Sequence, residues 1–528
     1  MNRRETCKLC FIWTYIIGFA THGFCYFNTT FNHDGTMIYL TDDDWKAEMG
    51  RYLTPIYRLF RTRYSAPWLT GVLSLVFLSL CTYLTVRMFS INRKSFIVCI
   101  AGLFSVNYSL IITNAYCIHD SDSYMFSVLL AVTSAYVLVC GFPWMERIKG
   151  LNVRTIVKIA LSGMCIAGSM ALYQAYVTLS FALILIYIIK GCLENNETAK
   201  TLRIIAETVI MYIVGAIFYI VGLKVFLKIF NVELASEGHN SITSVFSVDG
   251  WNILGGIRKA YGIFYEYFFE ITKFNRYFPI VVNVIVLVFC IIVAVCMCVS
   301  GRISIFNKIA VIVSFLIFPV VLGALSMISE VAHLMKVQYV TVYFIPLVIL
   351  QTSENIELKH NLKQLVTKAV SILMVISIVV VMYNSMAFAN GIYLAKTLDY
   401  QATYELMGNV ISDIGKVDGY VPGQTPVAFI GTPVTASQLN GQRNGYTNMW
   451  EMDSSTHDFY YSVTGYYTYF HYINSIMNIN MDIVSVSEAA EYAALPEVAS
   501  MPLYPSSESI KMVNGVVIVK FSQEPIPV

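Results

Sequence analysis

The sequence predicts an α-helical polytopic membrane protein with a small α/β domain at its C-terminal end. Of the 528 residues, 57% are hydrophobic and 13% are charged, whereas soluble domains carry about 25% charged residues. Apolar segments of about 20 residues, the length that crosses a bilayer, recur up to residue 389. After Gly391 the composition becomes that of a water-soluble domain. The expected partner is therefore a lipid bilayer, and nothing indicates nucleic acid.

Eleven segments are candidate membrane-spanning helices. They are residues 9–27, 68–88, 96–113, 124–144, 155–173, 176–190, 204–227, 279–299, 308–328, 338–351 and 369–389. The sixth and the tenth are the shortest of the set. The first follows three basic residues, like a signal peptide, but no small-residue cleavage site comes after it. We therefore interpret it as a retained span.

Basic residues in the short loops predict the orientation, because Lys and Arg accumulate on the cytoplasmic side. With the N-terminus inside, the inner loops contain Arg93, Lys94, Arg147, Lys149, Arg154, Lys158, Lys190, Lys200, Arg203, Arg302, Lys308, Lys359, Lys363 and Lys368. The outer loops 114–123 and 174–175 contain no Lys or Arg. Eleven spans then place the C-terminal domain outside.

The first outer loop departs from this rule. Its charged residues include Asp34, Asp42, Asp43, Asp44, Lys46, Arg51, Arg58, Arg61 and Arg63. The basic side chains could snorkel to lipid headgroups, or they could hold an anionic phosphate at the outer surface, which we favour. Asp34-Gly35 could also form a simple turn, and Asp42 to Asp44 are typical of a solvated helix start.

Two further segments lie on the predicted outer side. Residues 231–277 combine basic and aromatic residues, which suits an interfacial helix on the membrane or a helix packed on the protein. The C-terminal domain, residues 391–528, is predicted to contain a helix over 396–415 and strands over 426–430 and 483–486. A hairpin is predicted at its end, where Asn514-Gly515 indicates a type I′ turn.

Four groups of polar residues lie at the outer ends of the predicted spans. They are Asn32-His33-Asp34-Gly35, His119-Asp120-Ser121-Asp122, Tyr173-Gln174-Ala175-Tyr176, and Glu330, His333, Lys336 and Gln338. Ionisable residues at membrane depth are costly, so their clustering indicates a functional site. Asp120 could instead cap a helix, and the tyrosines could belong to an interfacial belt. A divalent metal held by His33 or His119 stays open, although structural hydrogen bonds are the commoner role, and no cofactor is assigned.

An acidic residue beside a basic cluster at the outer leaflet suits glycosyl transfer from a lipid-phosphate sugar. A carboxylate can take the proton from the acceptor hydroxyl as a general base. Cationic side chains can stabilise the departing phosphate, and the planar fork of arginine can hold it in two places. One base is sufficient if the reaction inverts the anomeric centre.

These residues resemble a known family. Four segments are similar to the type II serotype-converting (O-antigen) glucosyltransferases. They are the sequence HDG after a short first span, Gly50 to Arg58, the YQAY turn, and Met501 to Phe521. This is a bacterial membrane family of GT-C architecture, and the resemblance covers essentially the whole chain. It implies a GT-C-like membrane domain over residues 1–390, located in the cytoplasmic (inner) membrane.

The resemblance also implies the substrates. The donor is expected to be undecaprenyl-phosphate glucose or a similar polyprenyl-phosphate hexose, and the acceptor a surface polysaccharide or lipid-linked glycan. In GT-C enzymes the base is usually an acidic residue of the first outer loop, here Asp34, and the second acidic site corresponds to Asp120 or Asp122. The resemblance supplies no individual phosphate ligand, and Arg51 and Arg58 are chosen on charge and position. Other substrate contacts are expected, from the polar groups described above, at His33, His119, Tyr173, Gln174, Tyr176, Glu330, His333 and Lys336.

Three other functions are compatible with the sequence. A flippase or transporter of lipid-linked sugars would have repeated halves with broken spans, and we see no such repeat. A surface-binding protein would act through the C-terminal domain alone. A protein glycosyltransferase of the same architecture would differ only in its acceptor.

Overall fold

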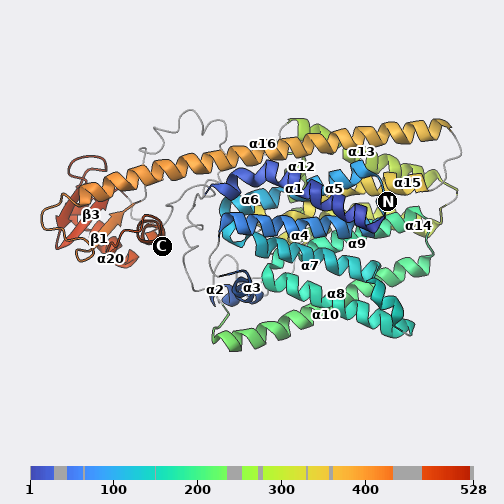
Figure 1. Ribbon diagram of the computed structural model, residues 1–528, viewed down its shortest axis with the longest axis horizontal. Helices are drawn as coiled ribbons and strands as arrows, with labels where there is room; N and C mark the ends of the chain where they lie inside the picture. The colour runs from blue at the N-terminus through green and yellow to red at the C-terminus, as the bar shows by residue number, and fades with distance from the viewer. Residues whose placement is uncertain are drawn as a thin grey trace.

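The computed structural model describes residues 2–28, 44–62, 66–148, 150–234, 253–271, 277–301, 303–328, 331–355, 361–431 and 466–523. These residues form a helical bundle and a small α/β domain, joined by one long helix (Figure 1). Of the predicted site residues, His33, Asp34 and Glu330 lie outside the described part of the chain.

The bundle consists of long apolar helices. They are α1 (Arg3–Phe27), α4 (Pro67–Met88), α5 (Lys94–Ser105), α6 (Tyr108–Tyr116), α7 (Ser121–Val139), α8 (Leu151–Leu172), α9 (Val177–Leu193), α10 (Thr198–Phe230), α13 (Tyr277–Val299), α14 (Ile305–Leu322), α15 (Phe344–Asn355) and α16 (Asn361–Ile414). Within the described residues, ten helical segments are long and apolar enough to cross a membrane. The predicted tenth span corresponds to a shorter pair, the 3-10 helix η7 (Val337–Tyr343) and α15. The chain is thus a helical polytopic membrane protein.

The pair α5–α6 is the most deeply buried span of the bundle. Its helix breaks at Asn107, where the side chain accepts a 2.8 Å hydrogen bond from the amide of Ser109 at the start of α6. The same side chain donates a 3.0 Å hydrogen bond to the carbonyl of Val337. Because buried polar groups need partners, Asn107 both starts α6 and fixes η7 against it.

Small residues allow α8 and α10 to approach closely. A Cβ atom at Gly215 would lie 2.8 Å from Ile166 and 3.2 Å from the carbonyl of Gly163. Such small-residue contacts are a usual way for membrane helices to pack, because lipid leaves no hydrophobic driving force between them.

Helix α12 (Ile253–Phe269) lies within residues 231–277, the second segment predicted on the outer side. One face packs on the bundle, where Gly256 contacts Met327 and Ala260 contacts Gly323. The other face leaves Leu254 79% exposed. The helix therefore packs on the protein, which was one of the two alternatives for this segment. It also presents an apolar face away from the bundle.

The C-terminal domain has its own core around a three-stranded sheet. The strand order is β1 (Val427–Ile430), β3 (Val516–Lys520), β2 (Ile510–Val513), with β1 and β3 parallel and β2 and β3 antiparallel. The shorter helical elements are α19 (Tyr466–Phe470), η9 (His471–Ile476), α20 (Val486–Ala493) and α21 (Pro496–Ala499). Asn514 and Gly515 have positive φ angles of 50° and 82°, as a type I′ turn requires, so the predicted hairpin is confirmed.

The prediction of a strand over residues 483–486 was wrong. Ile483 makes a single bridge to Val427, and Val486 begins α20. The reason is a capping box, in which the Ser485 hydroxyl accepts from the Glu488 amide and the Glu488 carboxylate accepts from the Ser485 amide. These paired bonds satisfy the free amides that start a helix.

Helix α16 connects the two parts without interruption. Its 54 residues span about 80 Å at 1.5 Å per residue, and it runs from the far end of the bundle to the sheet (Figure 1). The predicted span 369–389 and the predicted helix 396–415 are therefore one helix, and the expected domain boundary at residue 390 falls inside it. The core of the C-terminal domain includes α16 from Met407 onward.

We expect Gly215→Leu to destabilise the bundle, because its side chain cannot fit between α8 and α10. Overpacking of this kind costs about 1–3 kcal/mol, so the unfolding temperature in detergent should fall. Gly262→Ala on α12 is the control, since a Cβ atom there meets nothing within 4 Å. Equal unfolding temperatures for both variants would contradict the close approach of the two helices.

Candidate functional site

The described part of the predicted first outer loop, residues 44–62, contains two short helices, α2 (Asp44–Glu48) and α3 (Leu53–Arg61). They lie at the end of the bundle that faces the C-terminal domain, and the N-terminus lies at the other end (Figure 1). The structure does not describe the Asp44 side chain, but α2 begins at this residue, as the acidic run predicted.

Helix α3 turns its basic face inward. Arg58 and Arg61 are each only 7% exposed, whereas Leu59 and Phe60 are 61% and 87% exposed. Arg58 and Arg61 share one face because residues three apart are neighbours on a helix. This reversed amphipathic pattern places the arginines against the protein and offers apolar side chains to the surroundings.

The partners of this basic face are the two aspartates at the start of α7. Arg58 Nη2 lies 2.8 Å from Asp120 Oδ1, and Lys46 Nζ forms a second ion pair with Asp120 Oδ2. Arg61 Nη1 lies 2.8 Å from Asp122 Oδ1. All five side chains are buried. Both carboxylates are therefore occupied in holding α2 and α3 against α7.

Neighbouring groups complete this ionic cluster. Tyr57 donates a 2.9 Å hydrogen bond to Asp122, and Arg61 donates one of 2.9 Å to the His119 carbonyl. Burial and the charge of Asp122 raise the pKa of Tyr57, so its phenol stays protonated and can donate. The imidazole Nε2 of His119 lies 3.5 Å from Asp120. Among the described residues no group of three or more His, Cys, Asp or Glu could hold a metal.

Arg51 differs from Lys46, Arg58 and Arg61 because it forms no ion pair with a carboxylate within the described part of the chain, although the charge of Asp120 acts on it. Its side chain is 7% exposed and donates one 3.3 Å hydrogen bond, to the Tyr124 hydroxyl. Its guanidinium lies 4.6 Å from the centre of the Tyr173 ring, a cation–π contact. Its buried Nε has no hydrogen-bond partner among these residues. Such a buried cation is a candidate for binding an anion.

The backbone around Arg51 is held from the YQAY turn and from α10. Gly50 has a φ of +78°, which favours glycine, and its carbonyl accepts a 3.0 Å hydrogen bond from Tyr219. Gln174 donates a 2.8 Å hydrogen bond to the Met49 carbonyl. The predicted residues Tyr173 and Gln174 thus position Arg51: Tyr173 lies against its guanidinium, and Gln174 holds the backbone two residues before it.

The fourth predicted group lies nearby. Tyr176 donates a 2.9 Å hydrogen bond to the Leu334 carbonyl, and Tyr108 Oη lies 3.0 Å from His333 Nδ1. Lys336 is half-buried, and burial lowers its pKa while Glu266 acts to raise it. Tyr176 therefore connects the YQAY turn to the segment that carries His333 and Lys336.

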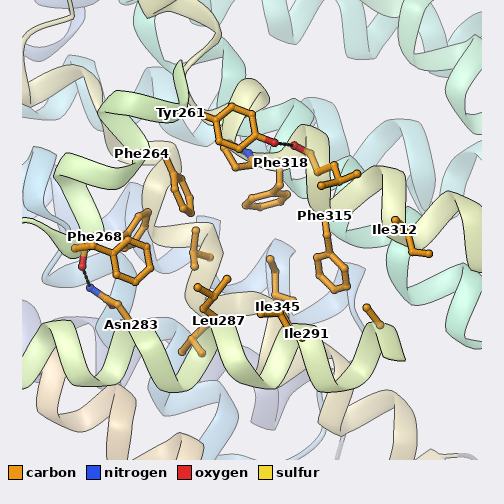
Figure 2. A pocket seen from close by; sticks show the side chains of 17 residues that line it. Tyr261, Phe264, Phe268, Asn283, Leu287, Ile291, Ile312, Phe315, Phe318 and Ile345 are labelled. Carbon is orange, nitrogen blue, oxygen red and sulfur yellow. Dashed lines mark hydrogen bonds between the residues drawn. The ribbon is translucent and has the colours of Figure 1, made fainter. Parts of the chain in front are cut away.

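An apolar cavity of about 390 Å³ lies between α12, α13 and α14 (Figure 2). Aromatic and aliphatic side chains line it, among them Phe264, Phe268, Leu287, Ile291 and Phe315.

The cavity connects to the polar groups through aromatic contacts. Tyr267, next to Phe268 of the wall, lies 4.6 Å from Tyr339 and 5.9 Å from Tyr108, measured between ring centres. Tyr108 in turn contacts His333. An apolar space and a group of polar side chains therefore lie side by side.

Sequence reasoning did not select Lys46, Tyr57, Arg61 or Tyr124 as site residues. The three-residue spacing of Arg58 and Arg61 was a usable signal, because it places both on one face of α3. Tyr124 is two residues beyond Asp122 and had no distinguishing feature. The contact of Lys46 with Asp120 joins residues 74 positions apart, so no local pattern indicates it.

The fold and the site define a polytopic membrane protein with a buried ionic cluster at one end of its bundle. A family model described as Glucosyl transferase GtrII matches residues 23–382, a segment that includes the whole cluster. The chain belongs to this family of glucosyl transferases, as the sequence resemblance indicated. No curated protein matches the chain, and no solved structure does.

We expect Asp122→Asn to destabilise the protein, because Arg61 loses its buried carboxylate partner. Breaking a buried ion pair costs about 3–5 kcal/mol, and thermal unfolding of the purified protein measures the loss. The double variant Arg61→Met/Asp122→Leu should recover most of it, since no charge is then left unpaired.

Glu5→Gln is the matched control, because Glu5 pairs with Lys94 at the surface, 3.4 Å away. Exposed pairs contribute only about 0–1 kcal/mol. If Asp122→Asn unfolded at the same temperature as Glu5→Gln, the cluster would not hold α3 in place.

Proposed function

We propose that the protein transfers glucose from a polyprenyl-phosphate donor to a glycan on the outer face of the membrane, with inversion. Family membership supports glucosyl transfer. The observation that carries the donor class is Arg51, a buried guanidinium without a carboxylate partner among the described residues. It lies at the end of a membrane bundle, where a lipid phosphate resides.

Arg51 and Arg58 have different roles in this proposal. Arg58 forms an ion pair with Asp120, which Lys46 also contacts, so it helps to hold α3. Arg51 keeps its charge and the hydrogen-bonding capacity of its Nε. The Tyr173 ring, whose centre lies 4.6 Å away, holds its guanidinium through a cation–π contact. It is thus suited to bind a phosphate and to stabilise the negative charge that develops on this phosphate when it leaves glucose.

Asp34 is the proposed general base. Asp120 and Asp122 are engaged by Lys46, Arg58 and Arg61, so their electron pairs are poorly available to an acceptor hydroxyl. Asp34 belongs to the same outer loop and lies within the family-matched segment. It would take the proton as the acceptor oxygen bonds to C1 of glucose and the C1–O bond to phosphate breaks.

The apolar cavity supports a polyprenyl donor. Its lining is almost entirely hydrocarbon (Figure 2), and it adjoins the polar groups through Tyr267 and Tyr108. We propose that it receives part of the polyprenyl chain, while the phosphate reaches Arg51.

The acceptor is proposed to be a surface polysaccharide or a lipid-linked glycan. The C-terminal domain lies at the same end of the bundle as the site (Figure 1), where it could meet a large acceptor. The test is to delete the gene and to analyse the cell-surface glycans. Loss of a glucose branch from a surface glycan supports the proposal. Loss of glucose only from proteins would show that the acceptor is a protein.

We expect Asp34→Asn to reduce glucosyl transfer by about 10²–10⁴-fold, the usual contribution of a general base. The assay uses purified protein in proteoliposomes with polyprenyl-phosphate glucose and acceptor. Membrane insertion and unfolding temperature should match the wild type. The matched control is Asp43→Asn, which should keep near-normal transfer. If Asp34→Asn also kept near-normal transfer, Asp34 would not be the general base.

We expect Ala294→Phe to weaken binding of long-chain donors, because Ala294 lines the cavity. Displacing two methylenes, each contributing about 0.8 kcal/mol, should raise the donor KM roughly tenfold. Val295→Phe is the control, since Val295 is 56% exposed on the same helix and does not line the cavity. A short-chain donor should bind both variants equally. If the KM of Ala294→Phe for the long-chain donor were unchanged, the polyprenyl chain would not occupy this cavity.

A further inference from the structure

Three buried tyrosines pack against each other beside Arg51. Tyr124 belongs to the first turn of α7, and Tyr173 and Tyr176 belong to the YQAY turn. The ring centres of Tyr124 and Tyr173 lie 4.2 Å apart, and those of Tyr173 and Tyr176 lie 4.9 Å apart. Because all three side chains are buried, this packing holds each ring in one position next to the guanidinium.

The hydroxyl group of Tyr124 has a proton to donate. A tyrosine hydroxyl can both donate and accept hydrogen bonds, and the Tyr124 oxygen accepts one of 3.3 Å from Arg51 Nη1. By comparison, the Tyr176 hydroxyl donates its proton to the Leu334 carbonyl, 2.9 Å away. No residue in the described ranges accepts the proton of Tyr124 in this way, although the side chain is only 4% exposed.

Arg51 adds further donors at the same place. Its guanidinium carries five N–H groups, and its one hydrogen bond within the described part of the chain goes to Tyr124. The buried Nε is among the groups without a partner there. Leaving a buried donor unpaired is costly, so such groups normally have an acceptor. Two side chains in contact, one of them charged, thus both hold protons for an acceptor that the described residues do not supply.

A phosphate group matches this pair of donors. It is an anion with several oxygen atoms, so one oxygen can accept from the Tyr124 hydroxyl while another accepts from the Arg51 guanidinium. A carbonyl group of the protein, in contrast, offers one oxygen and no charge. The geometry therefore favours an anionic ligand over a further backbone contact.

We propose that Tyr124 binds the phosphate of the lipid donor directly, by donating its hydroxyl proton to a phosphate oxygen beside Arg51. This inference rests on the proposed function. A polyprenyl-phosphate glucose is a phosphodiester with one negative charge. When the C1–O bond breaks, the bonding electrons stay on the phosphate oxygen, and the leaving polyprenyl phosphate carries two. Tyr124 keeps its proton, and its hydrogen bond strengthens as this charge grows, which stabilises the transition state more than the ground state.

The first test compares the binding of polyprenyl phosphate and of the uncharged polyprenol to the purified protein. Tyr124→Phe removes only the hydroxyl group. It should weaken binding of polyprenyl phosphate by about tenfold or more, as expected for a hydrogen bond to a charged group, and should leave polyprenol binding unchanged. Because the two ligands are compared within each variant, a change in basal stability does not affect the result.

Tyr136→Phe is the matched control. It removes a hydroxyl group from the same helix, 12 residues or about 18 Å further along α7, and should bind both ligands as the wild type does. In the proteoliposome assay, Tyr124→Phe should lower kcat by about tenfold or more, while Tyr136→Phe should not. A rise only in the acceptor KM of Tyr124→Phe would assign the hydroxyl to the acceptor and overturn the inference.

A double variant separates direct binding from a role in holding Arg51. If Tyr124 donates to the phosphate itself, Tyr124→Phe should still weaken polyprenyl phosphate binding when Arg51→Gln is already present. If Tyr124→Phe had no further effect in the Arg51→Gln protein, the hydroxyl would act only through Arg51, and the inference would be overturned.

Failure of the inference and failure of the proposed function give different results. If the wild type binds polyprenyl phosphate more tightly than polyprenol and Tyr124→Phe keeps the full difference, the inference alone fails. If the wild type does not distinguish the two ligands and transfers no glucose from polyprenyl-phosphate glucose, the proposed donor is wrong and the inference fails with it.

Discussion

The buried ion pairs between α3 and the start of α7 are the interaction on which the site depends. Arg58 and Lys46 share Asp120, and Arg61 pairs with Asp122. Removing either partner of such a pair leaves an uncompensated buried charge, so the pairs strongly specify one position for α2 and α3. Arg51 lies in the turn between these helices, and its placement follows from theirs.

This arrangement also gives the basic residues of the first loop a structural role. Three of the cations pair with two aspartates and hold α3 in place, which leaves one net positive charge in the cluster, while the apolar side chains of α3, Leu59 and Phe60, face away from it. Arg51 adds a further positive charge without an ion pair among the described residues, and it contacts Tyr173 and Tyr124. The loop therefore separates structural cations from a cation that is available to a ligand.

Helix α16 brings the C-terminal domain into this picture. It contacts α1 and α6 through Tyr393, and about four turns further on it enters the core of the sheet domain at Met407. Because no proline interrupts it, a single rigid element joins the site to the domain.

The sequence by itself determined the membrane class, most of the spans, the hairpin at Asn514-Gly515, and the grouping of polar residues at one end of the bundle. These follow from local periodicity, charge and turn chemistry, which neighbouring residues carry. Only the tertiary structure decided which aspartate pairs with which cation, and that Arg51 forms no ion pair among the described residues. Those ion pairs join positions 61 to 74 residues apart, and at such separations packing selects the partners.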